Sequence, residues 1–146
     1  MNFWQQLWAN KMLMSAVIAW AAAQVLKVLI NAVTHKDWDW SRLVGDGGMP
    51  SGHSATVTAL ATAALLQYGL SSFEFAVTAI LAIVVMHDAM GVRLEAGKHA
   101  KSINEIFSLL GKPVSPEEML EELLGHTPLQ VFSGAVLGVL AALVLR

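Results

Sequence analysis

Four long apolar segments divide the chain, and polar segments lie between them. The apolar segments are Met12–Val33, Ser54–Leu70, Phe73–Val92 and Leu129–Leu145. An α-helix needs about 20 apolar residues to cross the hydrocarbon core of a bilayer, and each segment is close to that length. Only two serines separate the second segment from the third, which predicts an antiparallel helical hairpin. The pattern therefore predicts an all-α bundle with about four transmembrane helices.

Other segments have the pattern of interfacial structure. From Arg93 to Leu110, apolar residues recur at intervals of three and four and charged residues fill the gaps, which predicts an amphipathic helix along the membrane surface. Pro116–Leu124 has the pattern of a short acidic helix with proline at its first position. The N-terminal segment carries two tryptophans and no signal-peptide cleavage pattern, so we expect an interfacial lead-in to the first apolar helix.

Composition supports a membrane protein. The 146-residue chain is 55% hydrophobic and 14% charged, whereas a soluble domain carries about 25% charged residues. The formal net charge of −2 gives no sign of a nucleic-acid partner. The lack of cysteine excludes disulfides, thiolate nucleophiles and zinc sites built on cysteine. We expect one membrane-embedded domain over residues 1–146, with one or two interfacial helices beside the four spans.

Polar side chains form a stripe inside the first apolar segment. Gln24, Lys27 and Asn31 are three and four residues apart, so they share one face of a helix. A lysine within a membrane span is costly and usually faces a polar cavity or a partner. The alternative is that Lys27 lies near the helix end and extends to the lipid headgroups. The alignment of the three polar residues favours the inward-facing arrangement.

A glycine-rich turn precedes the second apolar segment. Its sequence, Gly47–Ser54, reads GGMPSGHS and leads directly into an apolar helix. Backbone N–H groups at such a helix N-terminus can bind an anion. His53 falls in the first turn of the helix, where its imidazole can give or take a proton. The combination points to phosphate chemistry.

Simple alternation of four helices places other polar residues on the same side as this turn. Lys and Arg neutralise phosphate charge, one histidine can attack phosphorus, and a second can protonate the leaving oxygen. A carboxylate or an amide can fix the tautomer of the attacking histidine. Each feature is ordinary by itself, and their gathering on one side favours a functional site. The candidate residues are Lys27, Ser51, Gly52, His53, His87, Asp88, Arg93 and His126.

Four ordered parts of the chain resemble a known family. These parts are Lys27, the PSGH-containing turn Gly47–Ser54, the segment Asp88–Arg93, and the segment Leu123–Gly134 with its histidine and glycines. Together they are similar to the type-2 phosphatidic acid phosphatase superfamily, which includes the vanadium haloperoxidases. The closest likeness is to its divergent branch of bacterial and plant membrane proteins.

The resemblance implies a role for each site residue. His126 is implied as the nucleophile that forms a phosphohistidine, and His53 as the general acid for the leaving group. No metal or other cofactor is implied. Two positions depart from the superfamily pattern, because Gln130 stands where it has an aspartate and Leu120 where it has an arginine. The implied phosphate ligands are Lys27, Ser51, Gly52 and Arg93. Gln130 is predicted to bind substrate as well and can orient His126, and Asp88 is predicted to be a catalytic residue that takes the orienting role from another helix.

The leading hypothesis is a membrane phosphatase that acts on a lipid or isoprenoid phosphate. Two alternatives stay open: a protein that binds or transports a phosphorylated lipid without turnover, and a metal-dependent hydrolase. The second would use His53, His87, Asp88 and His126 as ligands. The expected partners are the phosphorylated substrate and membrane lipids. The sequence is also compatible with a homo-oligomer.

Basic residues are unevenly distributed between the two predicted sides of the membrane. Two of them, Lys11 and Arg146, fall on the side of the termini. Lysines and arginines near the ends of spans favour the cytoplasmic side. The chain is therefore predicted to be a multi-pass protein of the cell membrane with its candidate site facing the cytoplasm. The basic residues on the site side are Lys36, Arg42, Arg93, Lys98, Lys101 and Lys112.

Overall fold

The computed structural model describes residues 2–36, 38, 40–43, 47–111, 119–120, 122 and 124–146, and within these residues it is helical without a strand. The prediction of an all-α fold is confirmed. The helices of this part of the chain are α1 (Phe3–Ala9), α2 (Lys11–His35), the 3₁₀ turn η1 (Trp40–Leu43), α3 (Gly52–Tyr68), α4 (Phe73–Met90), α5 (Val92–Leu109) and α6 (Pro128–Val144).

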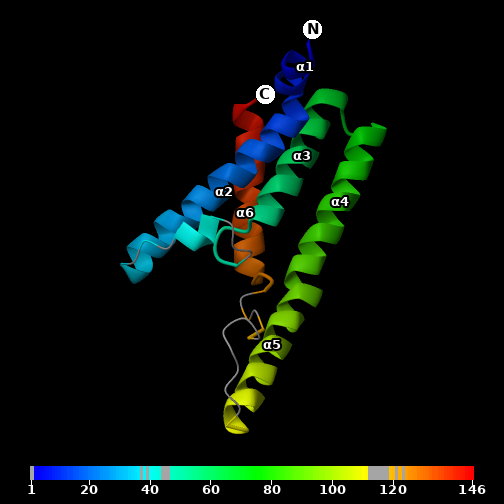
Figure 1. Ribbon diagram of the computed structural model, residues 1–146. Coiled ribbons are helices and arrows are strands. Elements are labelled where there is room, and N and C mark those ends of the chain that lie inside the picture. Colours follow the sequence, from blue (N-terminus) through cyan, green and yellow to red (C-terminus); the bar gives the residue numbers. More distant parts are fainter. Residues whose placement is uncertain are drawn as a thin grey trace.

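Helix α3 is the centre of a bundle and packs against α2, α4 and α6 (Figure 1). These four helices alternate in direction, so both termini lie at one end of the bundle. Small side chains bring the helices close together: Ala55 and Ala59 of α3 are fully buried with Ala19 and Ala23 of α2. The starts of α3 and α6 and the end of α4 therefore lie at the end away from the termini.

Two glycines set the separation of α6 from α3. A Cβ atom at Gly134 would collide with the backbone at the start of α3, and one at Gly138 would collide with the carbonyl oxygen of Ala55. The Thr58 hydroxyl donates a hydrogen bond across this contact to the Ala135 carbonyl oxygen at 3.2 Å. The two glycines lie four residues apart, a spacing that predicts close helix packing, and this prediction is confirmed.

The helix boundaries follow the apolar segments closely. Helix α2 covers the first segment and extends to His35, and α5 covers the predicted amphipathic helix. The predicted lead-in to the first segment is the short helix α1. The predicted acidic helix Pro116–Leu124 lies largely outside the described residues. Leu120 and Leu124, which are described, are not helical.

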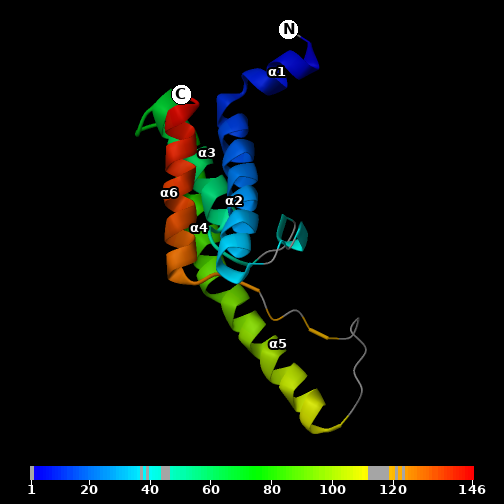
Figure 2. The ribbon, with the colours of Figure 1, turned by 90° about the vertical axis from the view of Figure 1, so that its left-hand side faces the viewer.

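Helix α5 continues past the bundle, and Figure 2 shows it leaving the end that is opposite the termini. The chain that returns towards α6 runs along it. A Cβ atom on Gly97 would lie 2.7 Å from the Glu122 carbonyl oxygen. The buried Asn104 side chain accepts a hydrogen bond from the Leu120 N–H at 3.1 Å and donates one to the Leu120 carbonyl oxygen at 2.9 Å. We call this returning segment, residues 119–125 as far as they are described, the strap.

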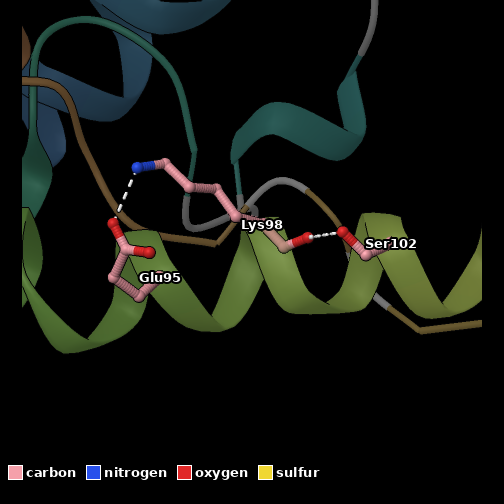
Figure 3. A network of polar contacts seen from close by, with 3 residues as sticks. All are labelled: Glu95, Lys98 and Ser102. Atoms are coloured by element: carbon pink, nitrogen blue, oxygen red, sulfur yellow. Dashed lines mark hydrogen bonds and ion pairs between the residues drawn. The ribbon is translucent and has the colours of Figure 1, made fainter.

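The exposed side of α5 carries a local polar network (Figure 3). The Lys98 ammonium donates to Glu95 Oε1 at 2.7 Å, and the Ser102 hydroxyl donates to the Lys98 carbonyl oxygen at 3.2 Å. The hydrogen bond from Lys98 to Glu95, together with the positive charge of Lys98, lowers the pKa of the Glu95 carboxyl from its ordinary value. The network stabilises α5 locally.

Two described helical stretches, Lys11–Thr34 and the α4–α5 stretch Phe73–Leu109, each contain an 18-residue segment that is apolar enough to span a membrane. Helix α6 is apolar but shorter. Large apolar side chains such as Ile80, Ile83 and Leu140 are more than half exposed on the outer surfaces of α4 and α6. Such surfaces suit contact with lipid. That all four helices of the bundle cross the bilayer remains a prediction.

Candidate functional site

Two histidines approach each other at the end of the bundle away from the termini. His53 lies in the first turn of α3, and His126 lies just before α6. Their ring centroids are 5.8 Å apart, and the ring planes are inclined at 60°. His126 is 1% exposed and His53 is half-buried. At this separation the two rings lie within contact range of each other.

The backbone around His126 is held by α4 and α5. Its N–H donates to the Ala89 carbonyl oxygen of α4 at 2.9 Å. The preceding Gly125 has a φ of +79°, and a Cβ atom there would collide with the backbone of Arg93 and Leu94 at the start of α5. Only glycine fits both the left-handed conformation and this close approach. The contact also brings Arg93 next to the histidine segment.

Ser51 connects the glycine-rich turn to α6. Its N–H donates to the Gln130 carbonyl oxygen at 3.0 Å. Its Oγ caps α3 by accepting from the Ser54 N–H at 3.3 Å, and it also accepts from the Ser54 hydroxyl at 3.0 Å. A hydroxyl has one donor and two acceptor positions, so the Ser51 hydrogen remains able to reach an anion. The predicted position of His53 in the first turn of this helix is confirmed.

The polar stripe of α2 faces inward. Gln24, Lys27 and Asn31 are 7%, 4% and 7% exposed, so the alternative in which Lys27 extends to the headgroups is not what the structure shows. Gln24 Nε2 donates to the Leu43 carbonyl oxygen at 2.8 Å, which fixes the orientation of the amide. Gln24 Oε1 then lies 3.5 Å from where a Cβ on Gly52 would be. This buried oxygen has no hydrogen-bond partner among the described residues.

Asp88 pairs with Arg93 at the junction of α4 and α5. Arg93 Nε donates to Asp88 Oδ2 at 3.0 Å, and both side chains are a little over two-fifths exposed. The carboxylate therefore fixes the orientation of the guanidinium at this junction. The expected use of Asp88 to orient His126 stays a prediction.

Comparison with known proteins adds to this geometry. A family model described as the Divergent PAP2 family matches residues 8–141. The chain belongs to this family. It is also 42% identical, over 152 aligned residues that cover 96% of each chain, to the uncharacterized membrane protein YuiD of Bacillus subtilis strain 168. No solved structure gives a significant match. The resemblance seen in the sequence is thereby confirmed, as is the relationship to a membrane protein.

Two positions at which this Divergent PAP2 chain departs from the superfamily pattern have structural roles. Gln130 Oε1 accepts from the Thr127 N–H at 2.9 Å, while Thr127 Oγ1 accepts from the Gln130 N–H at 3.4 Å, so the pair forms a capping box on α6. Leu120 lies on the strap, where its backbone binds Asn104. Gln130 therefore stabilises the helix that follows the histidine, and its amide nitrogen can still donate to a ligand.

Asn104 and Gly125 are site-supporting residues that sequence reasoning missed. Asn104 holds the strap, and Gly125 presses the strap against α5. A signal for Asn104 existed, because it is a polar residue four positions after Ala100 on the apolar side of the predicted helix. Gly125 gives no comparable signal, because its close neighbours are distant in sequence.

The metal-dependent alternative requires the side chains of four ligands to lie close together: His53, His87, Asp88 and His126. Across the described part of the chain, no group of three or more His, Asp or Glu side chains is close enough to hold a metal ion. His87 is exposed, and Asp88 is engaged by Arg93. The geometry thus favours a pair of histidines with cations over a metal centre.

Proposed function

We propose that this protein is a membrane phosphatase that removes the phosphate from a lipid or isoprenoid phosphate. The observation that carries the proposal is the contact between His53 and His126 at the N-terminal ends of two helices. Membership of the Divergent PAP2 family supports phosphatase-related chemistry. The substrate's tail lies in the bilayer, and its phosphate reaches the histidines at headgroup depth.

The proposed reaction has two steps. A nitrogen of His126 attacks phosphorus while His53 donates a proton to the leaving alkoxide oxygen, which releases the alcohol and leaves a phosphohistidine. His53 then takes a proton from water as the water attacks phosphorus, and the P–N bond breaks to give inorganic phosphate. His53 thereby regains the proton that it lost.

The charge of the phosphate is balanced by groups around the pair. Lys27 supplies a buried positive charge, and Arg93 supplies a planar guanidinium held by Asp88. The N–H groups at the start of α3 and the Ser51 hydroxyl bind a non-bridging oxygen. Gln24 Oε1, an acceptor, suits a protonated phosphate oxygen or the attacking water. This site end is proposed to face the cytoplasm, as the distribution of basic residues predicts.

Phosphate release from purified protein tests the proposal. We expect wild-type protein in detergent to release phosphate from phosphatidic acid or an isoprenyl phosphate with or without a chelator of divalent metals. We expect His126→Ala to lower the rate by about a thousandfold or more, because a nucleophile is lost. His99→Ala on the exposed side of α5 is the matched control. If wild type releases no more phosphate than His126→Ala, the hydrolase proposal fails.

A second candidate function is binding of a phosphorylated lipid without turnover. The observation that favours it is the neutral Gln130, which caps α6 in place of a carboxylate that would stabilise a histidine cation. Lipid phosphate would then bind tightly to His53→Ala and His126→Ala, and no variant would release phosphate. Release by wild type decides against this candidate.

A further inference from the structure

A cavity lies at the end of the bundle that carries the termini. Residues of α2 and α3 and the end of α6 line it, and its volume is about 330 Å³. This is within the size range of small-molecule sites. It is formed by different residues from those of the histidine site. The lining residues are Lys11, Ser15, Ala63, Leu66, Gln67, Ala142, Leu145 and Arg146.

The lining has the chemistry to hold an anionic amphiphile. Lys11 and Arg146 are exposed cations, and no acidic side chain is among the lining residues. Ser15 is 1% exposed, so its hydroxyl is a polar group deep in the bundle. The other walls are largely apolar, as Ala63 and Leu145 illustrate. Cations beside apolar walls match a ligand with a negative head and a hydrocarbon part.

The position of the cavity indicates where that ligand comes from. Helix α1 precedes Lys11 and turns away from the axis of α2 (Figure 2). Its aromatic residues Phe3, Trp4 and Trp8 are 70%, 64% and 67% exposed. Exposed tryptophans mark the membrane–water interface, and phospholipid headgroups lie at that depth. The cavity therefore opens where an anionic headgroup is available.

We infer that this cavity binds the headgroup of an anionic phospholipid, in the leaflet opposite the histidine site. The phosphodiester contacts Lys11 and Arg146, and the glycerol and first methylene groups pack against Ala63, Leu66 and Leu145. The lipid is bound as a ligand and is not hydrolysed there. The inference does not depend on the phosphatase proposal, because no residue is shared.

Native mass spectrometry of protein with added lipid tests the inference. We expect wild type to retain phosphatidylglycerol at least about tenfold better than phosphatidylcholine, and Lys11→Gln/Arg146→Gln to lose that preference. Lys98→Gln/Lys101→Gln removes two exposed charges from α5 and is the matched control, which should bind as wild type does. Lys11→Arg/Arg146→Lys should retain the preference.

The same experiment separates charge from shape. Gln67→Trp places a bulky ring at the exposed mouth without changing charge, and it should weaken retention of both lipids. Inorganic phosphate at equal concentration should displace neither. Three results would overturn the inference. They are equal retention of the two lipids by wild type, displacement of the lipid by inorganic phosphate, and a loss of preference in the α5 control variant as large as in Lys11→Gln/Arg146→Gln.

Discussion

The two ends of the bundle are both polar, but they are polar in different ways. At the histidine end, His126, Lys27 and Ser51 are almost completely buried, and neighbouring helices hold the backbone around them. At the terminal end, Lys11 and Arg146 are exposed around a cavity. Burying polar or charged groups in a membrane bundle is costly, whereas exposed cations cost little. The difference supports the two proposals made above, a fixed site for chemistry at one end and an adaptable site for recognition at the other.

Among the variants that test this difference between the two ends, replacement of the buried cation Lys27 should have the largest effect on activity. Lys27→Met keeps the shape of the side chain and removes its charge. Activity on a lipid phosphate should fall roughly a hundredfold, as for loss of a group that stabilises the transition state. The melting temperature should also fall, because removing one partner of a buried polar or ionic contact is destabilising. Parallel rate and melting measurements check both.

Lys101→Met, which removes an exposed cation of α5, is the matched control and should change neither quantity. A Lys27→Met protein that melts earlier but retains full activity would show that Lys27 serves the fold and not the site.

Gly52→Ala gives the next largest effect. A Cβ here would meet Gln24 at ordinary contact distance, so the bundle tolerates the methyl group, and helix propensity favours it. The methyl group would nevertheless cover the N–H groups at the start of α3. We expect KM to rise roughly tenfold while the melting temperature does not fall. Unchanged KM would place the phosphate elsewhere.

Much of this fold could be predicted from the sequence because local patterns determine it. The apolar segments predicted the helices. The spacing of Gln24, Lys27 and Asn31 predicted that they face inward, and the spacing of the two glycines of α6 predicted close helix packing. These features depend on periodicity within one helix. The gathering of polar groups at one end followed from alternation of helix direction.

The remaining features depend on contacts between distant segments. Asn104 binds both backbone groups of Leu120, which a helix in the strap would have used for itself. The ion pair of Asp88 with Arg93 depends on the start of α5 directly after the end of α4, which places Arg93 within reach of the carboxylate. Gln130 fits a capping box as well as a ligand, and the sequence alone does not decide between them.

Asn104→Ala should have a smaller effect, because it acts through the strap. The Asn104 side chain makes three hydrogen bonds, two with the Leu120 backbone and one to Glu122 Oε1. Their loss should lower the free energy of unfolding by about 1–2 kcal/mol and reduce activity a few-fold by loosening the segment before His126. Ser102→Ala, on the exposed side of the same helix, is the control. Equal activity of Asn104→Ala and wild type would show that the strap does not support the site.

The smallest expected effect concerns the exposed pair Glu95–Lys98. Because Lys98 lowers the folded-state pKa of Glu95, the pair contributes stability above the ordinary value of 4.5 and loses it as pH falls through the lower folded value. The melting temperatures of wild type and Glu95→Gln should differ slightly at neutral pH and converge in acid. Divergence in acid would contradict the assigned shift.

Trapping the covalent intermediate is the most direct test of His126 as the nucleophile. An aryl phosphate needs little help from a general acid, so His53→Gln should still be phosphorylated by it but should hydrolyse the intermediate slowly. Peptide mass spectrometry of His53→Gln, kept at alkaline pH, should find one phosphoryl group on His126. The variant that also carries His126→Ala should have none. An unmodified His126 in His53→Gln, or phosphorylation that survives His126→Ala, would rule out His126 as the nucleophile.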